Sequence, residues 1–95
     1  MVYVVSYDIV SDRTRRKLSK ILEGYGVRIQ YSVFECRLNE KRFQKMYQDI
    51  FKVTENEQEG SVRIYTLCKN CENRTVTIGK PMGQLEVLHS DVIVV

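Results

Sequence analysis

The sequence predicts an α+β domain in which helices cover one face of a β-sheet. Three observations lead to this prediction. The first nine residues are almost entirely apolar, as in a strand buried on both faces. Two later segments carry apolar residues at helical spacing. The remaining regular segments alternate between apolar and polar residues, as half-buried strands do.

Size and composition restrict the class of protein. The chain has 95 residues, which suits one compact domain, and its 43% hydrophobic and 28% charged residues are typical of a globular fold. No apolar run approaches the roughly 20 residues of a membrane span. Met1 leads directly into a strand, without a basic leader or a cleavage site. We therefore expect a cytoplasmic protein with no membrane partner.

The first strand presents two different faces. One face carries Tyr3, Val5, Tyr7 and Ile9, and the other carries Val2, Val4, Ser6 and Asp8. We expect the aromatic face to pack under helices and the smaller face to meet a second sheet. Asp8 is the only acidic residue of this strand.

A cationic helix follows the strand. It is expected to start near Ser11 or Asp12 and to run to about Tyr25, where glycines flank its end. Its apolar stripe lies opposite a stripe of four cations, which are Arg13, Arg16, Lys17 and Lys20. Two readings remain open for the four cations, a solvated face and a surface that contacts a phosphate backbone.

The middle of the chain predicts a hairpin and a second helix. Val27 to Leu38 is rich in strand residues but changes phase, which indicates a bulge or, as we prefer, a reversal around Tyr31 and Ser32. A helix from Glu40 to about Val53 follows, capped by Asn39. Its predicted buried stripe consists of Phe43, Met46, Tyr47 and Ile50.

The last part of the chain predicts two more strands and a terminal segment. Ser61 to Cys68 alternates as a strand, Lys69 to Arg74 forms a turn, and Thr75 to Gly79 forms another strand. The resulting order is ferredoxin-like, βαββαβ with an additional strand, in an antiparallel sheet with two helices on one face. Residues 1–80 form this domain, and residues 81–95 add to a sheet edge, of this chain or of a neighbouring one.

Asp8 is the candidate for chemistry. The plainer readings are that it caps the following helix or forms an ion pair with Arg15 or Arg16. One carboxylate alone is a poor Mg²⁺ site. In a two-fold homodimer, however, two copies of Asp8 could share one ion, which could then polarise a phosphodiester. A dimer that binds nucleic acid without cleaving it is the rival hypothesis.

The three cysteines are Cys36, Cys68 and Cys71. An odd number without a secretion signal argues against a disulfide framework. Cys68 and Cys71 have the spacing of half a zinc site, and the alternative is two thiols that flank a tight turn. A small metal-carrying domain is therefore a hypothesis of a different class.

Several motifs together resemble a known family. They are Tyr7-Asp8-Ile9, Arg15-Arg16, Gly24-Tyr25-Gly26, the run Arg28-x-Gln30-x-Ser32-Val33-Phe34-Glu35, and Arg63-Ile64-Tyr65. The chain resembles the small CRISPR-associated endonuclease, the ferredoxin-like subunit of the spacer-acquisition complex, over nearly its whole length.

The resemblance implies a homodimer in which the C-terminal segment joins the sheet of the partner. It implies one Mg²⁺ shared between two copies of Asp8, and cleavage of single-stranded RNA or double-stranded DNA. The alternative that it carries is a non-catalytic scaffold that holds duplex DNA and bridges subunits of the larger CRISPR-associated integrase.

The resemblance also assigns roles to residues. Asp8 is the metal ligand and a catalytic residue, and Tyr7 and Phe34 shape the catalytic site. For nucleic-acid binding the resemblance points to Arg15, Arg16, Arg28 and Ser32, to which the cationic stripe of the helix adds Arg13, Lys17 and Lys20 as candidates. The resemblance gives Cys68 and Cys71 no role.

Overall fold

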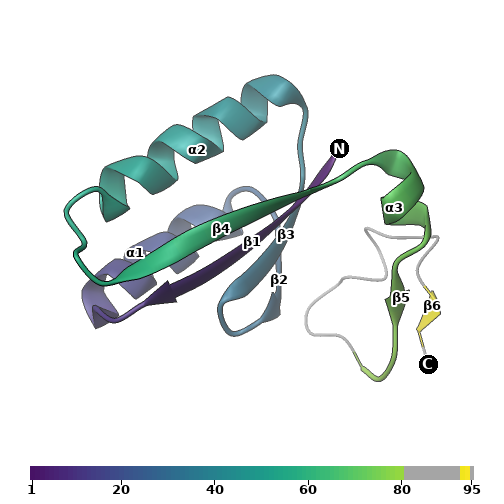
Figure 1. Ribbon diagram of the computed structural model, residues 1–95, viewed down its shortest axis with the longest axis horizontal. Coiled ribbons are helices and arrows are strands. Elements are labelled where there is room, and N and C mark those ends of the chain that lie inside the picture. The colour runs from purple at the N-terminus through teal and green to yellow at the C-terminus, as the bar shows by residue number, and fades with distance from the viewer. Residues whose placement is uncertain (81–92, 95) are drawn as a thin grey trace.

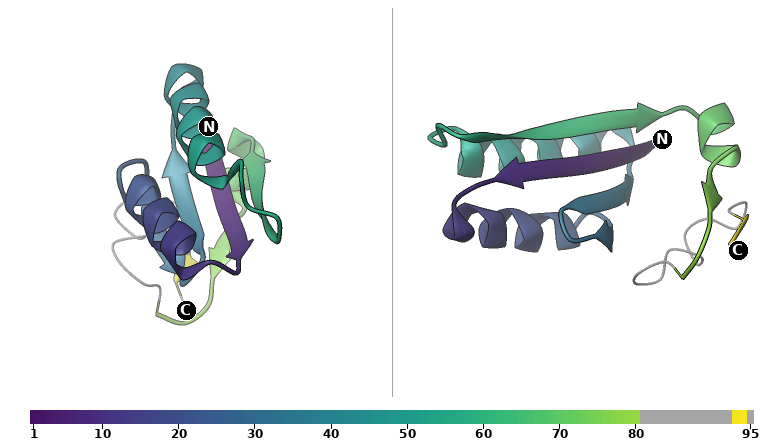
Figure 2. Two further views of the ribbon diagram at one scale, coloured as in Figure 1. Left: turned by 90° about the vertical axis from the view of Figure 1, so that its left-hand side faces the viewer. Right: turned by 60° about the horizontal axis from the view of Figure 1, so that its bottom comes forward.

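The computed structural model describes residues 1–80 and 93–94, and its main body is a four-stranded sheet with two helices on one face (Figures 1 and 2). The strands are β1 (Val2–Ile9), β2 (Val27–Gln30), β3 (Val33–Arg37) and β4 (Gly60–Leu67), and the helices are α1 (Asp12–Glu23) and α2 (Glu40–Thr54). The strand order is β2-β3-β1-β4, and every neighbouring pair is antiparallel. The predicted ferredoxin-like arrangement is confirmed.

Both long helices begin at side-chain caps. The Ser11 hydroxyl accepts a hydrogen bond from the Thr14 N–H at 3.3 Å, and the Asn39 side chain accepts one from the Arg42 N–H at 2.8 Å. Helix α1 ends at Glu23, two residues before the predicted end, because the Gly24 N–H already turns back to bond the carbonyls of the last turn. No helix in the described part of the chain is long and apolar enough to cross a membrane.

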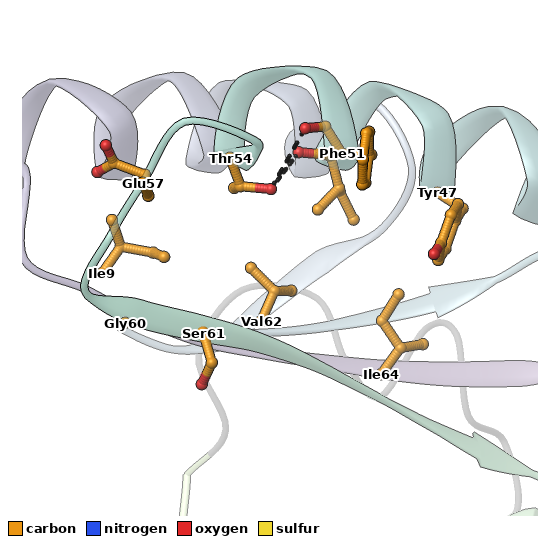
Figure 3. Close-up of a pocket in the computed structure, with 10 residues that line it drawn as sticks. Ile9, Tyr47, Phe51, Thr54, Glu57, Gly60, Ser61, Val62 and Ile64 are labelled. Atoms are coloured by element: carbon orange, nitrogen blue, oxygen red, sulfur yellow. Dashed lines mark hydrogen bonds between the residues drawn. The ribbon is translucent and has the colours of Figure 1, made fainter.

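The core lies between the sheet and the two helices. The aromatic face of β1 is buried there, as predicted, together with Phe34, Leu18, Leu22, Met46 and Ile50. Tyr47 was predicted to join this core but is 51% exposed. The buried stripe of α2 is centred on Met46 and Ile50, and β4 is the edge of the sheet, so no described strand extends far enough to cover Tyr47. Tyr47 instead lines a pocket between α2 and β4 (Figure 3).

The phase change after Val27 is a hairpin, as preferred from the sequence. β2 and β3 pair antiparallel around a reversal at Tyr31 and Ser32. The register also shifts between Arg28 and Gln30, so an irregularity accompanies the reversal. This shift accounts for the adjacent apolar pair Val33 and Phe34 in an otherwise alternating pattern.

The segment after β4 differs from the prediction. Helix α3 (Lys69–Asn73) replaces the predicted turn, and the strand that follows is short, β5 (Val76–Thr77). β5 does not join the four-stranded sheet but pairs in parallel with β6 (Ile93–Val94). The physical reason is that α3, anchored by an ion pair between Glu72 and Arg37 of β3, turns the chain past the end of the sheet (Figure 1).

The predicted C-terminal segment, residues 81–95, is described only at β6, where it pairs with β5 of the same chain. Residues 81–92 and 95 lie outside the described residues. Pairing of this segment with the sheet of a partner therefore stays a prediction.

A polar cluster joins the two long helices. The Tyr25 hydroxyl donates a 2.6 Å hydrogen bond to the Asp49 carboxylate, and the Arg42 guanidinium lies 4.6 Å from the centre of the Tyr25 ring. Arg42 also donates to the Gly24 carbonyl at 3.1 Å, and Lys45 lies 3.6 Å from Asp49. The hydrogen bond from Tyr25 is the main reason that the pKa of Asp49 lies below its ordinary value.

One glycine fixes how closely β4 approaches β1. Gly60 has φ +103° and pairs with Ile9, and a Cβ at this position would lie 2.2 Å from the Asp8 carbonyl oxygen. Gly79 has a similar φ of +104° but has open space around it. Both positions favour glycine for their conformation, but only Gly60 is also required for close packing.

Gly60→Ala is expected to lower the free energy of unfolding by about 2–3 kcal/mol, because the methyl group displaces the backbone of β1. Gly79→Ala is the matched control and should cost about 1 kcal/mol, the conformational term alone. Urea denaturation followed by circular dichroism measures both values. Equal losses in the two variants would contradict the close approach at Gly60.

Tyr25→Phe should make the free energy of unfolding less dependent on pH in the acidic range. A carboxyl whose folded pKa is depressed stabilises the fold above its unfolded pKa of 3.8, and this contribution is lost as the pH falls through the lowered folded value. The variant is therefore expected to be about 1 kcal/mol less stable than wild type at pH 7, with the difference shrinking in acid. The test is urea unfolding of both proteins from pH 7 down to pH values below 3.8. A difference in the free energy of unfolding that stays constant with pH would contradict the expectation.

Candidate functional site

The strand register places Asp8 on the face of the sheet that α1 and α2 do not cover, called the open face below. Asp8 pairs with Ser61, and Ser6 pairs with Arg63. Paired residues of antiparallel strands share one face, so these four side chains lie on the open face. Figure 3 shows the Ser61 side chain pointing away from α2, while Val62 and Ile64 point toward it. Asp8 is exposed between the buried residues Tyr7 and Ile9.

Arg15 holds the turn that follows Asp8. Its guanidinium donates hydrogen bonds of 3.0 Å to the carbonyls of Ile9 and Val10, and it forms an ion pair with Asp12. Ser11, not Asp8, caps α1. Within the described residues Asp8 forms no ion pair, so neither of the two plainer readings from the sequence is what the structure contains. The Asp8 carboxylate faces solvent on a strand end that Arg15 and Gly60 fix.

Tyr7 and Phe34 lie on the other side of the sheet from Asp8. Phe34 is fully buried, and its ring centre is 6.4 Å from that of Tyr7. The Tyr7 hydroxyl donates to the Tyr31 carbonyl at 3.4 Å. In a single chain these two residues therefore support the hairpin and β1 from the core, and they do not line the surface that carries Asp8.

Arg28 and Ser32 also make contacts within the fold. The Arg28 guanidinium hydrogen-bonds to the Ser19 hydroxyl and the Tyr31 carbonyl, and it lies 4.8 Å from the centre of the Phe34 ring. The Ser32 carbonyl accepts a 3.0 Å hydrogen bond from the Tyr7 N–H. The guanidinium of Arg28 thus connects the hairpin to α1.

The other four predicted cations form an exposed surface on α1, called the basic face below. It consists of Arg13, Arg16, Lys17 and Lys20. The opposite side of α1 buries Thr14, Leu18 and Leu22, so the basic face points away from the sheet. No described residue forms an ion pair with any of the four cations.

One chain does not offer a complete metal site. The described residues contain no group of three or more His, Cys, Asp or Glu side chains that could hold a metal ion. Asp8 contributes a single carboxylate to the open face, whereas Mg²⁺ takes one or two carboxylates and completes its shell with water and phosphate oxygens. The residues fit such an ion only if a second copy of the chain supplies another Asp8. The zinc hypothesis likewise has two thiols, Cys68 and Cys71, without a third ligand in the part of the chain described.

The sequence analysis did not assign roles to Ser61 and Arg63. Both lie on β4, and their position beside Asp8 depends on the register between β1 and β4, which local patterns do not specify. Arg63 is exposed and its guanidinium donates to the Tyr65 hydroxyl at 3.4 Å. The open face therefore carries a cation near the Asp8 carboxylate.

Comparison with known proteins identifies the family. The family model of CRISPR associated protein Cas2 matches residues 1–75. A relative from Synechocystis, named CRISPR-associated endoribonuclease Cas2 3, is 40% identical over 84% of this chain and 86% of its own. A relative of the same name from Chloroflexus aurantiacus is 43% identical over 94% of this chain and 95% of its own.

Solved structures agree with this assignment. The crystal structure of Streptococcus pyogenes Cas2 matches with a TM-score of 0.68 and 30% identity, over 83% of this chain and all of that one. A chain from a partial Cas6-RT-Cas1–Cas2 complex matches with a TM-score of 0.70 and 34% identity, over 87% of this chain and 97% of that one. Sequence and structure together show that the chain belongs to the CRISPR-associated Cas2 family.

Proposed function

We propose that the chain acts in CRISPR spacer acquisition as a homodimeric, Mg²⁺-dependent endonuclease. The observation that carries this proposal is the exposed Asp8 carboxylate on the sheet face that α1 and α2 leave uncovered. Relatives named as endoribonucleases support the activity, and the structural match within a complex that contains Cas1 supports the larger integrase as a partner.

The open face is a suitable surface for a second copy. Next to Asp8 and Ser6 it carries Val4, Tyr65 and Leu67, and Tyr65 is 49% exposed. A two-fold axis through this surface brings the same patch of each copy together. In the proposed dimer the C-terminal segment, residues 81–95, joins the sheet of the partner. The outer edge of β4 is the natural position, since no described strand pairs with it.

The dimer axis brings the two Asp8 carboxylates together. Two like charges at short distance repel, so a shared cation stabilises the arrangement. When bound, Mg²⁺ would polarise a phosphodiester and lower the pKa of a bound water. Asp8 holds the ion, while Arg15 and Gly60 fix the strand end from which the carboxylate projects. Tyr7 and Phe34 serve the site by supporting β1 and β3 from the core.

The basic face is the proposed surface for phosphates. Its cations are exposed and carry unbalanced charge, which suits contact with a nucleic-acid backbone. Arg15, Arg28 and Ser32 contribute in a different way. Arg15 holds the turn after β1, Arg28 holds the β2–β3 hairpin against α1, and the Ser32 carbonyl holds the hairpin to β1. The names of the relatives favour RNA as a substrate, and the proposed role in acquisition adds double-stranded DNA.

A second function is supported by the small number of reactive side chains around Asp8. The residues paired with or adjacent to it on the open face are serines and an arginine, and none of them is a general base. A dimer that holds duplex DNA between integrase subunits without cutting it needs only the basic face and the dimer contact. In that case Asp8 contributes to assembly.

Asp8→Asn is expected to abolish cleavage of labelled single-stranded RNA and duplex DNA, with a loss of at least about 100-fold, because the metal loses its protein ligands. Binding of the same duplex should change less than about threefold, since the basic face is intact. The matched control is Glu55→Gln, which neutralises an exposed carboxylate at the end of α2.

Gel-based cleavage with Mg²⁺ or EDTA, run beside binding measured by fluorescence anisotropy, checks this expectation. Cleavage that survives both EDTA and Asp8→Asn would contradict the metal-dependent enzyme. Binding without any cleavage in wild type would favour the scaffold.

Arg16→Ala is expected to weaken duplex binding and to reduce the slope of log K against log salt by about one unit, as one fewer phosphate is contacted. Lys41→Ala, on the charge-balanced surface of α2, is the control and should leave the slope unchanged. Fluorescence anisotropy at a series of NaCl concentrations measures both. An unchanged slope in Arg16→Ala would remove the basic face from the phosphate contacts.

A further inference from the structure

Two exposed thiols lie side by side at the start of α3. Cys68 is the residue that precedes the helix, and Cys71 is its third residue. Both are exposed, whereas Cys36 is buried in the core. Residues at this spacing lie roughly 5–6 Å apart between Cα atoms, which is within the range that a disulfide bridges.

The two thiols are not equivalent. The backbone N–H of Cys71 is the main cause that lowers the pKa of Cys68 below its ordinary value. The neighbouring Cys68 sulfur raises the pKa of Cys71. Because the thiolate is the nucleophile, Cys68 is the residue that attacks first and Cys71 the residue that attacks second. By contrast, burial raises the pKa of Cys36 to about 12.

We propose that Cys68 and Cys71 form a reversible dithiol–disulfide site that reacts with small disulfides. The Cys68 thiolate attacks one sulfur of the oxidant, forms a mixed disulfide and releases one small thiolate. Cys71 then loses its proton to solvent, attacks the Cys68 sulfur and displaces the second small thiolate. The protein loses two hydrogens, and the small disulfide is reduced to two thiols.

The site controls the segment that leaves the main sheet. α3 connects β4 to β5, and the Thr75 hydroxyl donates to the Cys71 carbonyl at 3.1 Å. The Glu72–Arg37 ion pair ties the same helix to the end of β3. A disulfide closed across the first turn of α3 adds a covalent constraint to this connection. Oxidation would thus fix the direction in which the chain leaves the domain toward β5.

This site is separate from Asp8. The register pairs Leu67, just before Cys68, with Val2 at one end of β1, and it pairs Ser61 with Asp8 near the other end (Figure 1). The inference therefore goes beyond the proposed nuclease and does not depend on it.

The direct test uses the full chain in buffers with a series of reduced-to-oxidised glutathione ratios, followed by acid quench, tryptic digestion and mass spectrometry. Trypsin cuts after Arg63, Lys69 and Arg74, so the reduced form yields two separate cysteine peptides. The oxidised form should yield residues 64–69 and 70–74 joined by the disulfide. Failure to find the joined peptides in the most oxidising buffer would overturn the proposal.

Two single variants keep the test decisive. Cys71→Ser should accumulate a mixed disulfide with glutathione on Cys68, because the second attack is missing. Cys68→Ser should react more slowly at neutral pH, because the thiol that remains lacks the backbone N–H contact that lowers the pKa of Cys68. Equal reactivity of the two variants, or stoichiometric zinc bound by both thiols in the purified protein, would contradict the proposal.

Discussion

The position of β1 between β3 and β4 is the constraint on which the rest of the structure depends. Its hydrogen bonds to both neighbours fix which side chains enter the core and which reach the open face. A slip of one residue would place Asp8 in the core and Tyr7 in solvent. The buried aromatic and aliphatic residues of β1 oppose that slip, because exposing each costs about 2 kcal/mol. The apolar face thereby holds the carboxylate in place on the other side of the strand.

The same register separates side chains that the sequence placed in one site. Asp8 projects from the open face, Tyr7 and Phe34 pack in the core, and the basic face lies on the solvent-exposed side of α1. Arg15 and Arg28 make contacts inside the fold. In the sequence, their charge alone did not distinguish these two arginines from Arg16 as candidates for phosphate binding. The arginines thus differ in their structural role: Arg15 and Arg28 hold the fold together, whereas Arg16 is exposed on the face proposed to contact phosphates. The incomplete metal site in one chain explains why the proposed chemistry requires two copies.

Local sequence patterns predicted the features that depend on interactions between residues close together in the sequence. The sequence was sufficient to predict the capping residues Ser11 and Asn39, the apolar stripe of α1 and the hairpin, because each depends on neighbours a few residues away. The exposure of Tyr47 depends on where the sheet ends, and the departure of β5 depends on the contact between Glu72 and Arg37. The position of Arg63 beside Asp8 likewise comes from strand register. Arg15 and Arg28 bond to residues nearby in the sequence, but their contacts depend on the exact path of the turn after β1 and of the hairpin, which the charge pattern does not specify.

The central claim is that two chains share one ion between their copies of Asp8. The most direct measurement is Mn²⁺ binding followed by electron paramagnetic resonance, which counts ions without relying on nuclease activity. The account predicts one tightly bound ion for every two chains in wild type and none in Asp8→Asn. One ion per chain, or binding that survives Asp8→Asn, would contradict it.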